Sequence, residues 1–122
     1  MVAAVEEITS TGAPIYFTPQ VVRESWSVLT RPRDVGGYGL TPALANTFIE
    51  RAHWGFRFAS DTPEIYDLWR DLVKTHQVSG RQAHDAYHVA AMIAHGLSRV
   101  LTLDVRDFNR YPGIAVLDPA TM

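Results

Sequence analysis

The sequence predicts an α/β fold built on a parallel sheet, which we expect to form one domain over residues 1–122. Short apolar runs of strand-forming residues alternate with longer segments of helical periodicity. The runs hold almost no polar residue, which is typical of strands buried on both faces. Strands that are separated by helices favour parallel pairing through crossover connections. The composition, 47% hydrophobic and 20% charged, is that of an ordinary globular chain.

The first half of the chain is expected to contain three helices and one strand. Thr18-Pro19 and Thr41-Pro42 each offer an N-cap hydroxyl and a proline suited to the first helical position. The expected elements are a helix over 2–9, a strand over 15–18, a helix over 19–29, a loop over 31–39 and a helix from Thr41 whose inner side is Leu44, Phe48, Ile49 and Ala52.

The second half is expected to contain three strands and two helices. The helix capped by Thr62-Pro63 carries an unbroken apolar stripe at i, i+3, i+4, i+7 and i+8, which indicates a core-facing helix. The stripe consists of Ile65, Leu68, Trp69, Leu72 and Val73. The other expected elements are strands over 56–60, 99–104 and 114–118, and a helix that Ser79-Gly80 starts and Gly96 stops.

Several classes of protein are excluded by composition. The chain has no cysteine, so it has neither disulfides nor thiolate metal sites. No apolar run is long enough to span a bilayer, and the start MVAAVEEITS lacks the basic region of a secretory signal. We therefore expect a cytoplasmic protein. A net charge of −2 argues against a broad polyanion-binding surface.

The segment HDAYH suggests a zinc site, because on a helix His84 and His88 would share one face, as in zinc hydrolases. Zinc hydrolysis also needs a third protein ligand and a general base. His95 would lie about 10 Å further along the helix at 1.5 Å per residue, too far to join the pair. We therefore favour the interpretation that these histidines form the polar edge of a buried helix.

Acidic residues near the ends of the expected strands indicate a different site. Asp85 opens a helix that is otherwise apolar, Glu24 begins the helix after the first strand, and Asp104 and Asp107 follow RVLTL. In parallel sheets, sites form at the carboxyl ends of the strands. Carboxylates without cysteine or a histidine triad suit a hard cation such as Mg²⁺ or Mn²⁺.

The sequence resembles the PIN domain family, specifically the VapC-like toxins of bacterial toxin–antitoxin pairs. The resemblance rests on the stretches FTPQVVRESWSVLTRP, FASDTPEIYDLWRDLV and VSGRQAHDAYHVAAMIAHGLSRVLTLDVRDFNRYPGIAVLDP. Residues 79–119 are the most specific part, with an H-D-A helix start, T-x-[DN]-x-x-D-F and a closing P-G-I-x-V strand in order.

The resemblance implies a parallel-sheet, three-layer PIN-like fold and an endoribonuclease that depends on Mg²⁺ or Mn²⁺. It implies that Asp85, Glu24, Asp104 and Asp107 bind the metal, the first three being catalytic, with Asp104 and Asp107 as alternatives. It also implies an RNA substrate, a cognate antitoxin as partner and a possible homodimer. The arginines available for phosphate contacts are Arg23, Arg31, Arg33, Arg81, Arg106 and Arg110.

One family feature is missing from the sequence, which leads us to expect an N-terminally truncated form. PIN domains begin with a strand that ends in D-[TS]-[NS], whose Asp is a metal ligand, and this strand lies between those matching 15–18 and 99–104. We expect a start upstream of Met1 or a decayed, truncated gene, in preference to a short form in which the two flanking strands close up on each other or a partner donates a strand. The alternative to a ribonuclease is a non-catalytic remnant that binds an antitoxin or itself, with Trp26, Trp54 and Trp69 as candidate anchors.

Overall fold

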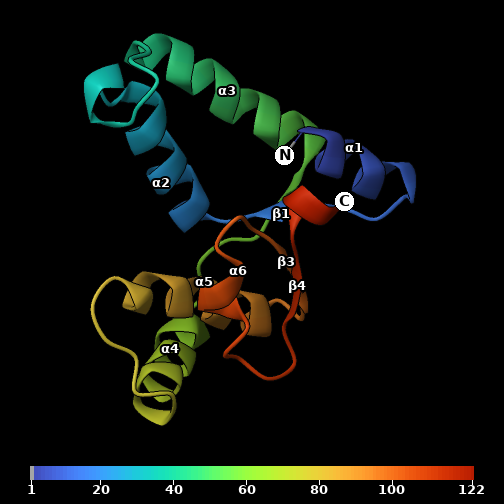
Figure 1. Cartoon of the computed structure of the whole chain (residues 1–122), viewed down its shortest axis with the longest axis vertical. Coiled ribbons are helices and arrows are strands. Elements are labelled where there is room, and N and C mark those ends of the chain that lie inside the picture. Colours follow the sequence, from blue (N-terminus) through green and yellow to red (C-terminus); the bar gives the residue numbers. More distant parts are fainter. Residues whose placement is uncertain (1) are drawn as a thin grey trace. The chain divides into compact units, whose positions relative to one another are not determined.

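The computed structural model describes residues 2–122, which divide into two compact units. The inserted unit is residues 14–60, and the main unit combines residues 2–13 with 61–122. Each unit has its own parallel strand pair and its own helices (Figure 1). No helix within residues 2–122 has the length and apolar character needed to span a bilayer.

The inserted unit is a pair of helices beside a two-stranded parallel sheet. Its elements are β1 (Tyr16–Phe17), α2 (Pro19–Thr30), η1 (Arg33–Val35), α3 (Pro42–Gly55) and β2 (Arg57–Phe58). The strands pair through Arg57 N–H to Ile15 C=O at 2.9 Å and Ala59 N–H to Phe17 C=O at 2.8 Å. α2 and α3 pack on each other and are joined by the turn that contains η1 (Figure 1).

Two of the three expected threonine N-caps are confirmed. Thr18 Oγ1 accepts from Val21 N–H, and Thr41 Oγ1 accepts from Leu44 N–H, both at 3.2 Å. The expected cap at Thr62 is wrong, because its side chain makes no capping hydrogen bond and its Oγ1 is buried. The proline that follows Thr62 still occupies the start of the helix.

The main unit contains the longer-range packing. Its elements are α1 (Val2–Ser10), α4 (Pro63–Thr75), α5 (Gln82–Ala94), β3 (Arg99–Leu101), α6 (Val105–Phe108), β4 (Ala115–Leu117) and η2 (Pro119–Thr121). β3 and β4 run parallel, with Val100 opposite Val116. Three predicted helices are confirmed: the one over 2–9 (α1), the one that starts at Pro63 (α4) and the one that ends before Gly96 (α5). Gly96 has φ +69° just beyond α5.

The core of the main unit lies between α4 and α5. Ile65 and Ala90 are fully buried in one cluster. Val89, also fully buried, and Phe108, 4% exposed, belong to another. Trp69 packs against both clusters, and its indole N–H donates to the Ala83 carbonyl at 2.8 Å. The apolar stripe of α4 therefore faces the core as its spacing predicted.

The strands differ from the expected ones in length and burial. Only two or three residues of each predicted run are paired, and the strands form two separate parallel sheets. Burial on both faces is wrong for the inserted unit, where Tyr16 is 38% and Phe58 43% exposed. In β1 only Phe17 is buried, and both residues of β2 are exposed. β3 and β4 have one exposed and two half-buried residues each, so burial on both faces is wrong for them as well.

The expected inner side of α3 is also partly wrong. Leu44 is 52% and Phe48 48% exposed, whereas Ala45 is fully buried. Phe48, Ile49 and Ala52 instead line an open groove against α2. The apolar residues were recognised correctly, but the sequence pattern does not show whether the opposing helix closes over them.

Candidate functional site

Asp85 is held in the first turn of α5 by the burial of the residues that follow it. Gly80 (φ +62°) lets the chain turn into the helix, and the Ala83 N–H donates to the Gly80 carbonyl at 3.1 Å. Ala86 and Val89 are fully buried, which anchors one face of α5 in the core. Asp85 is half-buried at the edge of that face, where the helix N-terminus favours a negative charge.

The short helix α6 was not expected from the sequence; Asp104 precedes it as the N-cap residue and Asp107 lies within it. The Asp104 N–H donates to Thr102 Oγ1 at 3.0 Å, and Asp104 is exposed at the helix start. Phe108 is buried in the core and fixes the orientation of α6. Asp107, next to it, is half-buried.

Asp107 is linked to the first turn of α5 by a side-chain hydrogen bond. Gln82 Nε2 donates to Asp107 Oδ1 at 3.4 Å. Residues three apart on a helix lie on one face, so Gln82 and Asp85 are neighbours on the surface of α5. The bond therefore brings α6 to the side of α5 that carries Asp85.

Asp85 and Asp107 both influence the pKa of the buried Tyr111. Its side chain is 3% exposed, and its hydroxyl is buried with no hydrogen-bond partner within residues 2–122. Burial raises the pKa of Tyr111, the Arg110 guanidinium lowers it, and the charges of Asp85 and Asp107 raise it further. The raised pKa keeps the hydroxyl protonated at neutral pH, and the charges of both acids contribute to the shift.

Glu24 belongs to the inserted unit and is described separately from the three aspartates. It is exposed on α2, one turn after Gln20, whose Nε2 donates to Glu24 Oε1 at 3.0 Å. It also borders the groove between α2 and α3.

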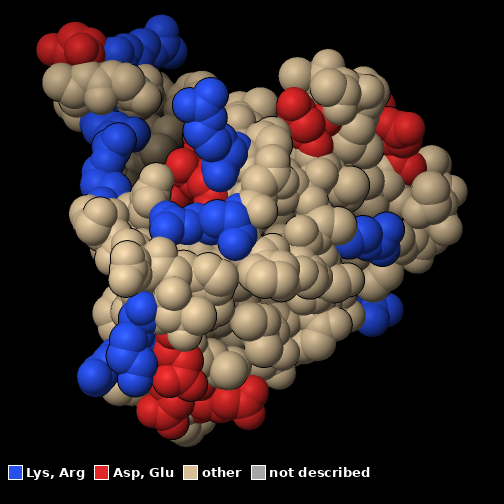
Figure 2. All heavy atoms as spheres, turned by 60° about the horizontal axis from the view of Figure 1, so that its bottom comes forward, with Lys and Arg blue, Asp and Glu red and all other residues tan. Residues whose placement is uncertain are grey.

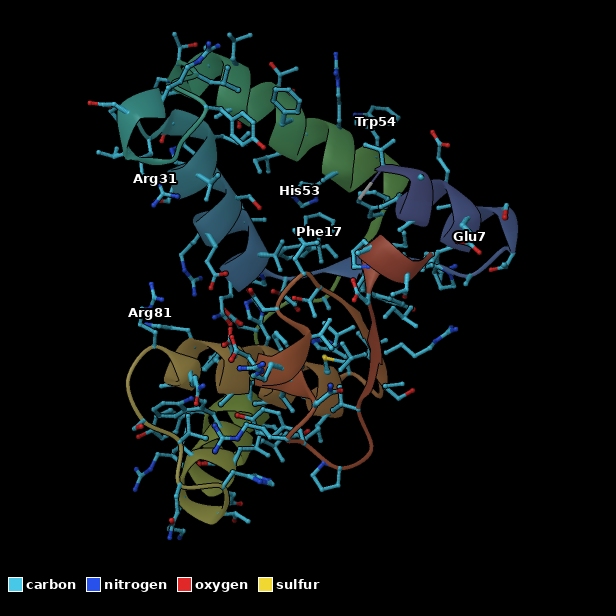
Figure 3. All side chains as sticks on the ribbon, viewed as in Figure 1. Glu7, Phe17, Arg31, His53, Trp54 and Arg81 are labelled. Atoms are coloured by element: carbon cyan, nitrogen blue, oxygen red, sulfur yellow. The ribbon has the colours of Figure 1, made fainter. Side chains whose placement is uncertain are left out.

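That groove is apolar and has a volume of about 590 Å³. Its walls include Val21, Val28 and Leu29 from α2 and Phe48 and Ile49 from α3. Figure 3 shows Phe17 and His53 pointing toward each other below α3, with their ring centroids 4.9 Å apart. Trp54, on the other side of α3, is 90% exposed (Figure 3).

The donor set of the main unit suits some metals better than others. Within residues 2–122, no three His, Asp or Glu side chains lie close enough together to hold an ion. A catalytic zinc site needs three protein ligands, so the zinc alternative gains no support from this geometry. Mg²⁺ commonly uses one or two carboxylates and keeps water at its other positions. Asp85 and Asp107 fit that pattern.

Three residues at this site were not recognised as such from the sequence. Gln82 donates to Asp107, Arg110 donates to Gln82, and Tyr111 is influenced by the charges of Asp85 and Asp107. Arg110 had been considered only as a phosphate contact. The spacing of Gln82 and Asp85 could have indicated a shared helix face. Nothing in the sequence indicates that Arg110 contacts Gln82.

Comparison with known proteins identifies the family. The sequence matches the family model described as the PIN domain over residues 2–114. The structure is similar to that of VapBC2 from Rickettsia felis bound to a promoter DNA fragment, with a TM-score of 0.69 and 11% identity over 96% of this chain and 83% of that chain. It is also similar to DNA-bound VapBC from Salmonella typhimurium, with a TM-score of 0.65 and 18% identity over 94% of this chain and 83% of that one.

No curated protein matches the sequence. At these identities the two solved structures show a shared fold, and the family model covers almost the whole chain. The protein belongs to the PIN domain family.

Proposed function

We propose that the protein is a VapC-like endoribonuclease that hydrolyses RNA phosphodiester bonds with Mg²⁺ or Mn²⁺. The observation that carries this proposal is that Asp107 is hydrogen-bonded to Gln82, which shares a face of α5 with Asp85, and that both half-buried acids influence the buried Tyr111. The family supports it, because the expected metal ligands of a PIN domain include both positions.

Asp85 and Asp107 would hold the cation. When bound, it would neutralise phosphate charge and lower the pKa of a coordinated water molecule. Without a cation, the two carboxylates would repel an RNA phosphate. Their role is thus to bind the cation and to fix where a phosphodiester can approach.

Arg81 and Arg106 are the proposed phosphate contacts of the main unit. Both are exposed, Arg106 lies on α6 beside Asp107, and Arg81 extends from the loop before α5 (Figure 3). An arginine guanidinium can bind phosphate oxygens through paired hydrogen bonds. These side chains would orient the RNA backbone relative to Asp85.

Glu24 and Asp104 stay predicted ligands that rest on the family resemblance. If Glu24 contributes to catalysis, Glu24→Gln will slow cleavage. Asp104, just before α6, is more exposed than Asp107 within it, and the contributions of the two acids are compared below.

The test is cleavage of single-stranded RNA by the purified full chain with Mn²⁺ or with EDTA. We expect Mn²⁺-dependent cleavage that Asp85→Asn reduces by at least about 100-fold, since changes to outer-shell residues alone cost 10- to 100-fold. The matched control is Asp67→Asn, which removes the same charge from an exposed position on α4.

Cleavage that survives Asp85→Asn would overturn the proposed site. No cleavage at all, with intact binding of an inhibitory partner, would instead favour the non-catalytic alternative.

We also propose that an antitoxin-type protein covers the groove between α2 and α3. Support comes from the groove's apolar walls, since Val21 is 36% and Phe48 48% exposed, and from the VapBC complexes that share the fold. Contiguous exposed apolar surface of this kind marks interaction sites. The homodimer stays a prediction of the resemblance.

The partner proposal is tested by inhibition. A small protein that co-purifies with the chain should inhibit its RNA cleavage, and Ile49→Asp should relieve inhibition without lowering cleavage itself. Asn46→Asp, on the same helix but outside the groove walls, is the control. Inhibition that is equally strong against Ile49→Asp would exclude the groove.

A further inference from the structure

A chain of polar contacts joins the end of α4, the first turn of α5 and the loop after α6. Arg110 donates from Nη2 to the His76 carbonyl and from Nη1 to Gln82 Oε1, both at 2.7 Å. Gln82 Nε2 then donates to Asp107 Oδ1 at 3.4 Å. All three links lie within the main unit.

The donors and acceptors at the two ends of this hydrogen-bond network fix which way the Gln82 amide is oriented. A guanidinium can only donate, so it must bond to the oxygen of the Gln82 amide. The amide NH₂ is then left facing Asp107, whose carboxylate only accepts when ionised. Arg110 therefore determines which way the Gln82 amide points, and Gln82 in turn orients Asp107.

Arg110 is itself held in place. Besides its two short hydrogen bonds, its guanidinium lies 5.9 Å from the centre of the Tyr111 ring. The Tyr111 ring packs edge-on against His76, with centroids 5.0 Å apart. An exposed arginine with three such contacts is better ordered than a solvated charge, which suits a structural rather than a phosphate-binding role.

The contact through Gln82 leaves more of Asp107 available to a cation than a direct ion pair with Arg110 would. Gln82 is neutral and occupies one carboxylate oxygen of Asp107, so the second oxygen stays available as a ligand. A guanidinium bound directly to Asp107 could occupy both oxygens and would compete with a cation through its charge. The amide orients the carboxylate without neutralising it.

Asp104 has no comparable support. Its backbone N–H bonds to Thr102, its side chain makes no capping bond, and it is exposed. Asp107, not Asp104, is the α6 acid that shares the electrostatic environment of Tyr111 with Asp85. The two alternatives that the sequence leaves open are thus distinguished by their contacts.

We propose that Gln82 and Arg110 are positioning residues that hold Asp107 toward Asp85 and make Asp107, rather than Asp104, the cation ligand contributed by α6. This inference rests on the proposed function, because it concerns the ligands of the cation site proposed there. The contacts themselves can be tested without any metal.

The first measurement is the NMR signal of the Gln82 side-chain NH₂ group in the metal-free full chain. Arg110→Met should shift it, because the amide loses the partner that orients it, and Asp107→Asn should shift it as well. Arg106→Met is the matched control, since it removes the same charge one turn earlier, and it should leave the signal in place. An unchanged Gln82 signal in Arg110→Met would overturn the positioning chain.

The second measurement is Mn²⁺ affinity by calorimetry, which is independent of RNA cleavage. We expect Gln82→Met and Arg110→Met each to weaken binding by about 10- to 100-fold, as for other outer-shell residues. The double variant should be no weaker than the single ones, because both act through Asp107. Asp107→Asn should abolish binding, and Asp104→Asn and Arg106→Met should change it by less than about twofold.

The outcomes separate this inference from the proposed function. A wild-type chain that binds no Mn²⁺ overturns both. Binding that is lost in Asp104→Asn but kept in Asp107→Asn overturns the assignment alone. Binding that depends on Asp107 yet is unaffected by Gln82→Met overturns the positioning role alone and leaves the ribonuclease proposal standing.

Discussion

At the scale of single residues, the environment of Tyr111 bears most directly on the proposed site. Its hydroxyl is buried without a hydrogen-bond partner within residues 2–122, although Asp85 and Asp107 both influence it. Burying a hydroxyl in this way costs free energy of folding. A protein keeps such a feature most readily where the group serves a ligand, which agrees with a cation site at this place.

Tyr111→Phe should raise the free energy of unfolding by about 1 kcal/mol at neutral pH, because it removes an unsatisfied buried group. Urea unfolding measures this. Tyr66→Phe is the control, since that exposed hydroxyl accepts a hydrogen bond from Arg70 at 3.1 Å. A loss of more than about 1 kcal/mol in Tyr111→Phe would mean that the hydroxyl is hydrogen-bonded after all.

The same tyrosine predicts a dependence of stability on pH. Its pKa in the folded protein is raised above the ordinary 10.0, chiefly by burial. The folded state therefore binds the phenolic proton more tightly than the unfolded state does. The contribution is fully present below pH 10 and is lost as the pH rises through the folded pKa.

Stability should consequently decline above pH 10 in the wild type and decline less in Tyr111→Phe. Urea unfolding at a series of pH values is the measurement, with Tyr66→Phe again as the control. Parallel declines in the wild type and Tyr111→Phe would contradict the raised pKa.

The sequence singled out Asp85 and Asp107 as candidate ligands, but it did not indicate the residues that contact them. Asp85 was singled out because it opens a mostly apolar helix and matches the family pattern, and Asp107 because it belongs to the D-F pair of that pattern. Gln82 and Arg110 could not be recognised in this way, because their contact joins residues 28 positions apart. Such a pair depends on how α5 and the loop after α6 pack, which no local pattern encodes.

At the scale of elements, the packing of α4 on α5 holds the main unit together. Trp69 contacts both buried clusters and donates its indole N–H to α5. It therefore couples the core to the helix that carries Asp85.

Trp69→Phe should lower the free energy of unfolding by about 2 kcal/mol or more, because it loses both volume and a hydrogen bond. Trp54→Phe should change it by less than about 0.5 kcal/mol, because Trp54 is 90% exposed. Equal effects of the two changes would contradict the assignment of Trp69 to the core.

The helix caps give a second prediction at this scale. Thr41→Ala should cost about 1 kcal/mol, since it removes the bond to Leu44 N–H. Thr62→Val should be neutral or stabilising, because the Thr62 hydroxyl is buried and makes no capping bond. Urea unfolding of both variants checks the contrast, and a clear loss of stability in Thr62→Val would show that its hydroxyl is in fact bonded.

The helices were more predictable than the strands. Periodicity and Thr-Pro starts located α2, α3 and α4, because these signals lie within each helix. Strand length depends on pairing with distant residues, and the sheets here pair over only two or three positions. α6 was missed because four residues are too few to show a helical period.

At the scale of the whole molecule, charge does not single out one broad nucleic-acid surface. The net charge is −2, and Figure 2 shows both basic and acidic side chains at the surface. RNA affinity should therefore come from a few local phosphate contacts. We expect log K for RNA to fall with log [KCl] with a slope of about −1 to −2.

Removing two contacts tests this directly. Arg81→Gln with Arg106→Gln should make the slope shallower by about 1.4, because each phosphate contact to a single strand contributes about 0.7. Arg70→Gln, on the exposed face of α4, is the control. Fluorescence anisotropy with labelled RNA gives the affinities, and an unchanged slope in the double variant would exclude these arginines as contacts.

The central claim is that Asp85 and Asp107 bind a divalent cation together. Anomalous diffraction at the manganese edge, from crystals of the full chain grown with MnCl₂, tests it most directly. We predict a peak in contact with carboxylate oxygens of both residues, and its loss in Asp107→Asn crystals. A peak bound by His84 and His88 instead, or no peak in contact with Asp85 and Asp107, would contradict the account.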